Sequence, residues 1–435
     1  MSGFSRTVTV RLKADTTDRC RYHLSVNSIP RAFVLLLLLT PCPAAAQRPL
    51  PQALVDPAVS SALAAVDARR DQTARFLAAI GGIVSPSGRE GERAQAVAAE
   101  MRRIGLADVT LDATPNVVGR IRGRSGKALI FVSTLDDLAT VAALQTATHA
   151  PLHIDGDRVV GPGANTSTTT SSLIAAADAL MKSGLRPEHD LVFAAVAQEE
   201  TGLKGMQALY AQWKDRALAF VDILGDGHSI TYGAITIHWW KVVASGPPGH
   251  SLNGGVPNVN QGIGRAVDRI LQLPQPERYR DRRLVINVAM LQSGAVYNHK
   301  PDTGWFSLDV RSLDGARVEE VEAEVRKILA GVTAETTIAF TMEPTQMTPG
   351  GQIPGLRDSA LVTTAAAISA QLGYAAQLGD AGSSNMNVPL GQGTPAIGIG
   401  GNRGGQRGFA DEWGDIPQMM RTAKYLVLLA ATIGM

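Results

Sequence analysis

The sequence predicts an α/β fold in which helices flank a mainly parallel sheet and a smaller α/β unit is inserted into the chain. The main observation is a set of apolar runs, such as 128–132 and 190–197, in which polar residues do not alternate. Runs of this kind are typical of strands that are buried on both faces. They alternate with segments of helical periodicity, and that alternation favours a doubly wound sheet.

The order of the expected elements changes in the inserted unit. A strand, a helix, two strands, a helix and a strand are expected at 235–245, 260–273, 284–291, 304–312, 316–330 and 337–342. This β-α-β-β-α-β order is the ferredoxin-like arrangement. We therefore expect a lid or dimerisation domain at 234–346, between the two parts, 47–233 and 347–435, of one α/β domain.

The composition is that of a globular protein large enough for two domains. The chain has 435 residues, 45% of which are apolar, and a formal net charge of +2. This charge balance gives no reason to expect binding to nucleic acid or to an anionic membrane surface. Both cysteines, Cys20 and Cys42, lie near the amino terminus, so the rest of the chain offers no disulfide and no thiolate ligand.

Residues 1–46 have the pattern of an export signal with an upstream extension. Arg31 precedes the apolar segment 32–39, which is too short to span a bilayer. The small residues 44–46 then form an expected cleavage site before Gln47. We expect cleavage near Ala46, a periplasmic or secreted mature protein, and a true translation start near Val26.

Two adjacent glutamates follow the apolar run 190–197. Glu199 and Glu200 stand at the carboxyl end of the expected strand, where open α/β sheets place their ligand sites. Neighbouring side chains on an extended segment point in opposite directions, so one carboxylate can serve a metal ion and the other a proton. An isolated Glu-Glu pair is more often a solvated acidic turn, so the interpretation depends on the rest of the chain.

From about residue 56 to the carboxyl terminus the chain resembles the dinuclear-zinc exopeptidases. This family includes peptidase T, acetylornithine deacetylase, succinyl-diaminopimelate desuccinylase and glutamate carboxypeptidase. The resemblance is carried by blocks in the family's order, at 85–90, 161–165, 199–202, 246–251, 298–311 and 393–397. It implies an inserted lid and the metal-dependent hydrolysis of peptide or amide bonds in small peptides or N-acyl amino acids. Two zinc ions clamp the attacking water and the scissile carbonyl in this chemistry.

The resemblance assigns catalytic roles to a few residues that are present. Glu199 matches the general base that activates water, and Glu200 matches a metal ligand. Asp226 matches the position of the next ligand. The family's first ligand belongs to a His-x-Asp pattern that here reads Thr134-Leu-Asp136, so Asp136 is expected to support the site without binding metal directly.

The remaining ligand positions are replaced. The bridging aspartate of the family corresponds to Thr166, and the last histidine, four residues before Glu412, corresponds to Gly408. With Thr134, three of the five direct ligands are therefore missing, and the last histidine of the whole chain is His299. Without the bridging carboxylate two neighbouring dications would repel each other strongly. We expect the family's zinc site to be incomplete in this chain. We therefore expect that no cofactor is bound.

Two functions of different class remain open. In the first, the protein binds a small peptide or amino-acid derivative with little or no catalysis. In the second, it is an active metallopeptidase or amidohydrolase that uses Glu199 as base and an altered, mononuclear metal site, with His228 as a replacement nitrogen ligand. A histidine at a strand end is, however, more often solvated or hydrogen-bonded.

The lid carries the expected substrate-binding residues. His250 matches the histidine that in relatives polarises the substrate carbonyl, sometimes in a partner subunit, so a homodimer through the lid is expected as an option; a turn histidine is the alternative. Asn298 and Arg311 match positions that bind the substrate carboxylate or backbone. Arg311 suits bidentate carboxylate binding, although a neighbouring acid on its own strand would suit it equally. Trp239 and Trp240 are expected on opposite faces of a strand.

The hydroxyl run 166–172 precedes an expected helix at 173–181. Its side-chain oxygens are expected either to cap the helix or, with the helix dipole, to bind an anionic group. No histidine pairs with these serines in a recognisable nucleophile motif, which argues against a serine hydrolase.

Overall fold

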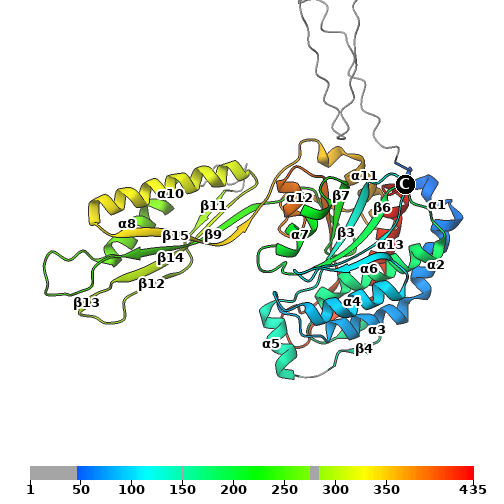
Figure 1. Cartoon of the computed structure of the whole chain (residues 1–435), viewed down its shortest axis with the longest axis horizontal. Coiled ribbons are helices and arrows are strands. Elements are labelled where there is room, and N and C mark those ends of the chain that lie inside the picture. The colour runs from blue at the N-terminus through cyan, green and yellow to red at the C-terminus, as the bar shows by residue number, and fades with distance from the viewer. Residues whose placement is uncertain (1–46, 149–150, 275–283) are drawn as a thin grey trace, which may run out of the picture. The chain divides into compact units, whose positions relative to one another are not determined.

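We describe the chain from a computed structural model, which describes residues 47–148, 151–274 and 284–435 (Figure 1). The expected export signal and its cleavage site near Ala46 lie outside these residues. Within the described part of the chain, no helix combines the length and the apolar character that crossing a membrane requires.

The main domain is built on an eight-stranded sheet, and the predicted mainly parallel α/β fold is confirmed. Its central strands β6 (Asp190–Val196), β3 (Ala128–Thr134), β7 (Ala217–Ile223) and β17 (Ala396–Gly400) are neighbours and run parallel. Every residue of β6 is buried, which explains its unbroken apolar run. The outer strands are β1 (Ala107–Leu111), β2 (Val117–Ile121), β8 (Ser229–Thr231) and β16 (Gln377–Gly379).

Helices pack against this sheet (Figure 1). Two of them, α6 (Ala164–Ser183) and α13 (Ile416–Thr432), pack against each other and are buried over most of their length. The others are α1 (Leu50–Leu54), α2 (Pro57–Ala68), α3 (Arg70–Gly81), α4 (Gly91–Arg103), α5 (Ala139–Thr148), α7 (Lys204–Trp213), α11 (Ala360–Gln371), α12 (Asn387–Gly391) and the 3₁₀ helix η2 (Leu356–Asp358). Together with the sheet they enclose one continuous apolar core.

A small second sheet lies beside the amino-terminal half of α6. Its order is β18-β19-β5-β4, with β18 at Gly404–Gly405, β19 at Trp413–Asp415, β5 at Arg158–Val160 and β4 at His153–Asp155. A side chain at Gly414 would lie 2.7 Å from Thr168 Cγ2, so β19 packs closely on α6 because glycine stands there. This sheet thereby joins the chain segment that precedes α6 to the segment that follows β17.

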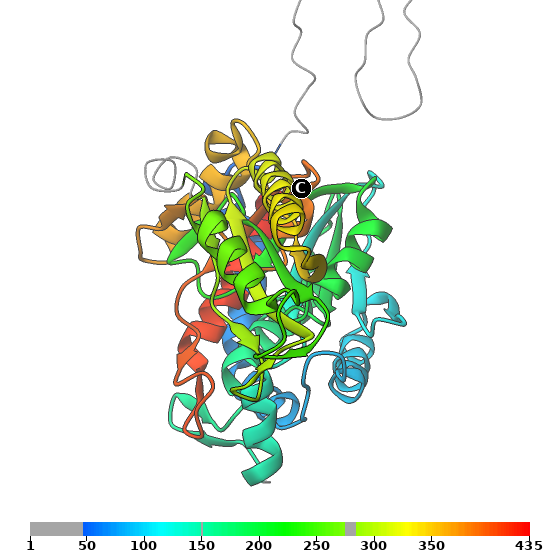
Figure 2. The ribbon, with the colours of Figure 1, turned by 90° about the vertical axis from the view of Figure 1, so that its left-hand side faces the viewer.

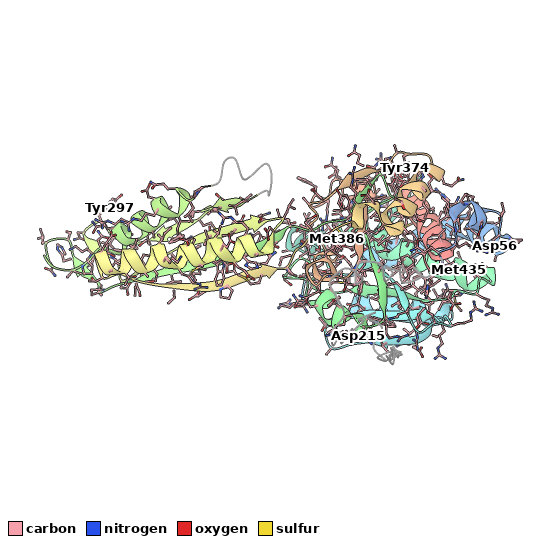
Figure 3. All side chains as sticks on the ribbon, turned by 90° about the horizontal axis from the view of Figure 1, so that it is seen from above. Asp56, Asp215, Tyr297, Tyr374, Met386 and Met435 are labelled. Atoms are coloured by element: carbon pink, nitrogen blue, oxygen red, sulfur yellow. The ribbon has the colours of Figure 1, made fainter. Side chains whose placement is uncertain are left out.

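The inserted lid has its own core and the predicted β-α-β-β-α-β order. The elements are β9 (Thr236–Ser245), α8 (Val259–Leu271), β11 (Val285–Asn287), β14 (Thr303–Ser312), α10 (Gly315–Thr336) and β15 (Ala339–Thr348), with short strands β10 (Gly249–His250), β12 (Leu291–Ser293) and β13 (His299–Lys300). The two helices lie on one face of the antiparallel sheet β11-β14-β9-β15 (Figures 1 and 2). Side chains from helices and sheet form the second apolar core (Figure 3).

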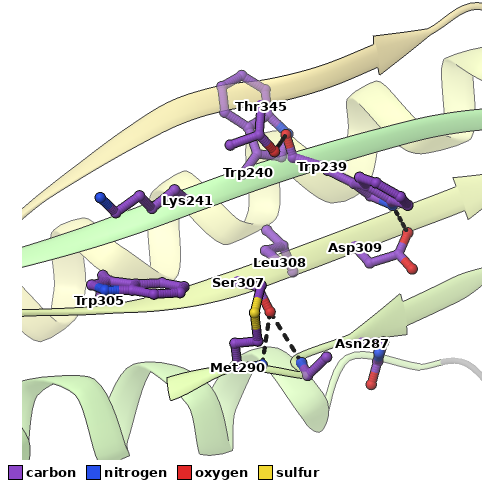
Figure 4. Close-up of a pocket in the computed structure, with 11 residues that line it drawn as sticks. Trp239, Trp240, Lys241, Asn287, Met290, Trp305, Ser307, Leu308, Asp309 and Thr345 are labelled. Carbon is purple, nitrogen blue, oxygen red and sulfur yellow. Dashed lines mark hydrogen bonds between the residues drawn. The ribbon is translucent and has the colours of Figure 1, made fainter. Parts of the chain in front are cut away.

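The two tryptophans of β9 lie on opposite faces of the lid sheet, as predicted. Trp240 Nε1 donates to Glu322 Oε1 of α10 (2.7 Å), so this ring lies on the helix side. Trp239 is 38% exposed on the other face and donates to Asp309 Oδ1 (2.9 Å). That open face holds a mainly apolar groove of about 330 Å³, in which Trp239, Met290 and Trp305 are prominent (Figure 4).

Candidate functional site

Asp136 fixes the loop that carries the two glutamates. It lies just beyond β3, the parallel neighbour of β6, and is fully buried. Its carboxylate accepts hydrogen bonds from the backbone N–H of Glu199 at Oδ1 and of Glu200 at Oδ2, both at 3.0 Å. Asp136 therefore fixes the backbone of this loop, and its expected place beside the metal ligands stays a prediction.

A second buried carboxylate supports the same loop and was not singled out from the sequence. Glu90 Oε1 accepts from the backbone N–H of Gln198 (3.0 Å) and of Gly88 (2.7 Å). Gln198 has a φ of 55°, which is uncommon for a residue other than glycine. The paired supports from Glu90 and Asp136 hold the glutamate turn in this conformation.

Glu199 lies in an environment that favours its neutral form. Burial raises the pKa of Glu199 to about 8, and the neighbouring carboxylates of Glu200, Asp222 and Asp136 act in the same direction, whereas Arg407 acts against them. The four carboxyl groups that meet here therefore disfavour a further negative charge at Glu199.

Glu200 is bound by an arginine. Arg407 Nη2 donates to Glu200 Oε1 at 2.6 Å, and the two side chains are 35% and 25% exposed. A guanidinium group competes directly with a metal ion for this carboxylate. The sequence showed Arg407 only as part of a glycine-rich stretch, so its position at the site was not predicted.

Asp222, on β7, is a further buried acid that was missed. It accepts from the backbone N–H of Met386 (3.2 Å) and from Asn385 Nδ2 (3.4 Å). Burial raises the pKa of Asp222, and the hydrogen bonds that it accepts oppose the shift. The sequence did not point to Asp222 because this residue lies inside an apolar run. A single charged residue there looks like a break in the pattern of a buried strand and not like part of a site.

Thr134 lies in the same network. Asn385 Nδ2 also donates to Thr134 Oγ1 (3.1 Å), which connects the first ligand position of the family to Asp222. The side-chain carbonyl oxygen of Asn385 has no hydrogen-bond partner within the described residues. A hydroxyl thus occupies a position where the family resemblance calls for a nitrogen ligand.

Asp226 is fully buried beyond β7, and its Oδ1 is hydrogen-bonded whereas its Oδ2 has no partner within the described residues. Its Oδ1 lies 2.8 Å from His228 Nδ1 and accepts from the backbone N–H of Asn402 (3.2 Å). The His228 ring stacks on Tyr374 at 3.9 Å between centroids. His228 is therefore positioned as a hydrogen-bond partner of Asp226. A hydrogen-bonded histidine is the alternative to a metal ligand that the sequence analysis gave for this residue.

The amino terminus of α6 is occupied by Glu412. Its Oε1 accepts from the N–H groups of Gly163 (3.0 Å) and Asn165 (2.9 Å), and its Oε2 accepts from Gly408 N–H (3.1 Å). The protein's own carboxylate thus takes the favourable position at the positive end of the helix. Gly408 contributes only its backbone there.

The expectation that the hydroxyl run 166–172 caps the helix is therefore wrong, while anion binding by this run stays untested. The residues already belong to α6, and Thr168, Thr169 and Ser172 donate to backbone carbonyls one turn earlier. They do not cap the helix, and Glu412 accepts the hydrogen bonds at its amino terminus. Thr166 is buried, and its hydroxyl has no partner within the residues that the structure describes.

Replacing Glu412 by glutamine is expected to lower the free energy of unfolding by about 1–2 kcal/mol. Glutamine keeps one acceptor oxygen but loses the charge, and its amide N–H₂ would face a backbone N–H. Thermal or urea unfolding measures the loss. The matched variant Glu319→Gln, at an exposed position of α10, should unfold like the wild type; equal stability of the two variants would contradict the assignment.

The lid residues form a separate group. His250 Nε2 lies 3.2 Å from the Asn298 side-chain amide, so the structure brings these two together. Arg311 Nε donates to Asp309 Oδ1 (2.9 Å) and its guanidinium lies 5.6 Å from the Trp239 ring centroid. Arg311 therefore pairs with an acid on its own strand, as the alternative interpretation of the sequence held.

The α/β domain, its inserted lid and the acids at the carboxyl ends of β3, β6 and β7 define a chain of the metallopeptidase class. Residues 137–432 match Peptidase family M20/M25/M40, and the chain belongs to this family. Carboxypeptidase G2 of Pseudomonas sp. (strain RS-16) is 26% identical over 218 residues, which cover 49% of this chain and 50% of the carboxypeptidase. The alignment thus spans about half the length of that relative.

Solved structures of similar fold cover nearly all of the described chain. Aminopeptidase PepT from Bacillus cereus has a TM-score of 0.70 at 17% identity, covering 83% of this chain and 98% of its own. A tripeptidase from Staphylococcus aureus gives 0.68 at 16% identity, with 83% and 97% covered. Human carnosine dipeptidase 1 gives 0.58 at 14% identity, with 85% and 98% covered. At these identities the likeness shows the fold alone.

The zinc ions that the family implies do not fit the residues of this site. Zinc requires nitrogen, thiolate or carboxylate donors, and Thr134, Thr166 and Gly408 supply none of these. Of the matched ligands that remain, Glu200 is paired with Arg407. Across the described ranges, no group of three or more His, Cys, Asp or Glu side chains is arranged to hold a metal ion.

Proposed function

We propose that this protein binds a small peptide or an amino-acid derivative at the carboxyl end of its central sheet and hydrolyses it weakly or not at all. The replacement of three ligand positions by Thr134, Thr166 and Gly408 carries this proposal, because two-metal hydrolysis depends on both ions. Family membership supports the ligand class, since similar structures are named as an aminopeptidase, a tripeptidase and a dipeptidase.

The test measures metal content and turnover in the same samples. The protein, expressed from Met1, is loaded with zinc, desalted, analysed for bound metal and assayed on a panel of dipeptides and N-acyl amino acids. We expect clearly less than one zinc per chain and no turnover that depends on Glu199, so that Glu199→Ala and the exposed control Glu319→Ala behave alike. Direct binding of panel compounds is followed by calorimetry.

The opposite outcome defines the alternative function. Stoichiometric zinc together with turnover that Glu199→Ala abolishes would show an active metallopeptidase or amidohydrolase with an altered, mononuclear site. His228 would then be the residue to replace next, because it lies beside Asp226.

We also propose that the mature protein acts outside the cytoplasm and that the lid is the surface through which two copies would associate. The first part follows from the export pattern of residues 31–47 and the second from the family resemblance of the lid. Amino-terminal sequencing of the exported protein and light scattering test the two parts separately.

A further inference from the structure

Two arginines reach the site from a glycine-rich segment whose backbone packs closely against Asp226 and β19. Arg403 and Arg407 lie within 400–408, directly after β17. A side chain at Gly401 would lie 2.4 Å from Asp226 Oδ1, and one at Gly404 would lie 2.0 Å from the Trp413 carbonyl oxygen. Only glycine permits these approaches, so the segment is held between Asp226 and β19.

Arg407 forms an ion pair with Glu200, the carboxylate that matches a metal ligand of the family. Its Nη2 is 2.6 Å from Glu200 Oε1, and its buried Nε has no hydrogen-bond partner within the described residues. The guanidinium is thus fixed at one end by Glu200 and retains an unused donor at the other. Arginine is suited to this position because its planar group can bind carboxylates through several donors.

Arg403 places a second positive charge in the same region. Its Nε donates to Asn165 Oδ1 (2.9 Å), which ties it to the start of α6. Burial and the like charge of Arg407 lower the pKa of Arg403 to about 10. The nearby acids Glu199, Asp222 and Glu200 oppose that shift. The two guanidinium groups therefore share one set of acidic side chains.

We propose that Arg403 and Arg407 are permanent countercharges that take the electrostatic place of the metal ions at this site. Carboxylates gather where β3, β6 and β7 end, and buried carboxylates without countercharge are costly. Relatives with two zinc ions meet this need with metal; here covalently attached cations meet it, and they cannot be removed by a chelator or exchanged. The inference rests on the proposed function and goes beyond it, because it says what holds the site together.

The proposal is tested by removing each charge from the full chain. The variants are Arg407→Met and Arg403→Met, with Arg407→Lys to keep the charge and Arg357→Met, exposed in η2, as the matched control. Thermal unfolding is recorded with chelator, with Mg²⁺ and with Zn²⁺. We expect the wild type and Arg357→Met to be indifferent to all three additions.

The two methionine variants should behave differently. We expect each to unfold about 2–5 °C lower than the control. In Arg407→Met the Glu200 carboxylate loses its partner, and in Arg403→Met the nearby acids lose a positive charge and Asn165 Oδ1 loses its donor. A divalent cation should restore part of the loss in Arg407→Met, since Glu200 is then free, while Arg407→Lys should stay close to the wild type. Methionine variants that match the control and ignore divalent cations would overturn the proposal; if Arg403→Met does not fold, the comparison of Arg407→Met with Arg407→Lys still decides.

The outcome is separable from that of the proposed function. Glu199-dependent turnover by the zinc-loaded wild type would contradict non-catalytic binding while leaving the arginine variants to be judged by their unfolding. A wild type without turnover whose stability falls on addition of chelator would contradict only the countercharge proposal.

Discussion

Replacing Arg93 by methionine is expected to lower the free energy of unfolding by about 3–5 kcal/mol. Arg93 lies on α4, is 1% exposed, and donates to Asp137 Oδ2 (2.6 Å) and to the carbonyl oxygens of Leu135 (2.8 Å) and Ile83 (2.6 Å). Methionine fills similar space without charge or donors. Asp137, which is fully buried, would then lose its countercharge. The Ile83 carbonyl would lose its partner, whereas the Leu135 carbonyl would keep the Ser85 hydroxyl (3.1 Å).

Two further variants make this prediction specific. Arg102→Met changes an exposed arginine of the same helix and should unfold at nearly the wild-type denaturant concentration. Adding Asp137→Asn to Arg93→Met should recover part of the lost stability, because burial already raises the pKa of Asp137 and an amide removes the uncompensated charge. Equal urea midpoints for Arg93→Met and Arg102→Met would refute the assignment.

The second large effect concerns pH. Burial and the acids around it raise the pKa of Glu199 from an ordinary 4.5 to about 8. A carboxyl group with a raised pKa binds its proton more tightly in the folded state, so its contribution to stability is fully present below pH 4.5 and is lost as the pH rises to about 8. The loss is on the order of 5 kcal/mol.

Glu199→Gln removes the titrating group and should flatten this dependence. Urea unfolding between pH 5 and pH 9 is the measurement, with Glu319→Gln as a control that keeps the wild-type slope. At about pH 8 the glutamine variant should be the more stable protein. A slope that Glu199→Gln leaves unchanged would assign the pH dependence to other groups.

The fold was predictable because its signals are local and repeated. The unbroken apolar run of β6 reports burial on both faces, and the alternation of strands and helices reports a parallel sheet. The order of elements in the lid was equally readable. The hydroxyl run misled because Ser and Thr favour helix caps in general, whereas here they lie inside α6 and bond back to it.

The site was only partly predictable, for a physical reason. Glu199, Glu200 and Asp136 follow strand ends, where the sequence itself indicates a ligand site. Arg407 meets Glu200 across 207 positions of the chain, and no periodicity reports such a contact. Asp222 was hidden within an apolar strand. The residues Thr134, Thr166 and Gly408 at the ligand positions could be read from the sequence, but the position of Arg407 beside Glu200 could be found only in three dimensions.

The connection of the lid has a consequence for how such proteins evolve. Ala234 and Gly351 exchange two backbone hydrogen bonds of 3.0 Å, and beyond them β9 and β15 run as antiparallel neighbours, with Ile237 opposite Thr348. The lid is therefore connected to the main domain through one pair of antiparallel strands, in the way that a hairpin would be. Since the entropy of closing a loop grows only slowly with its length, the host sheet is nearly indifferent to what lies beyond that hairpin. Lineages can enlarge, shorten or exchange the lid while the acidic turn after β6 stays unaltered.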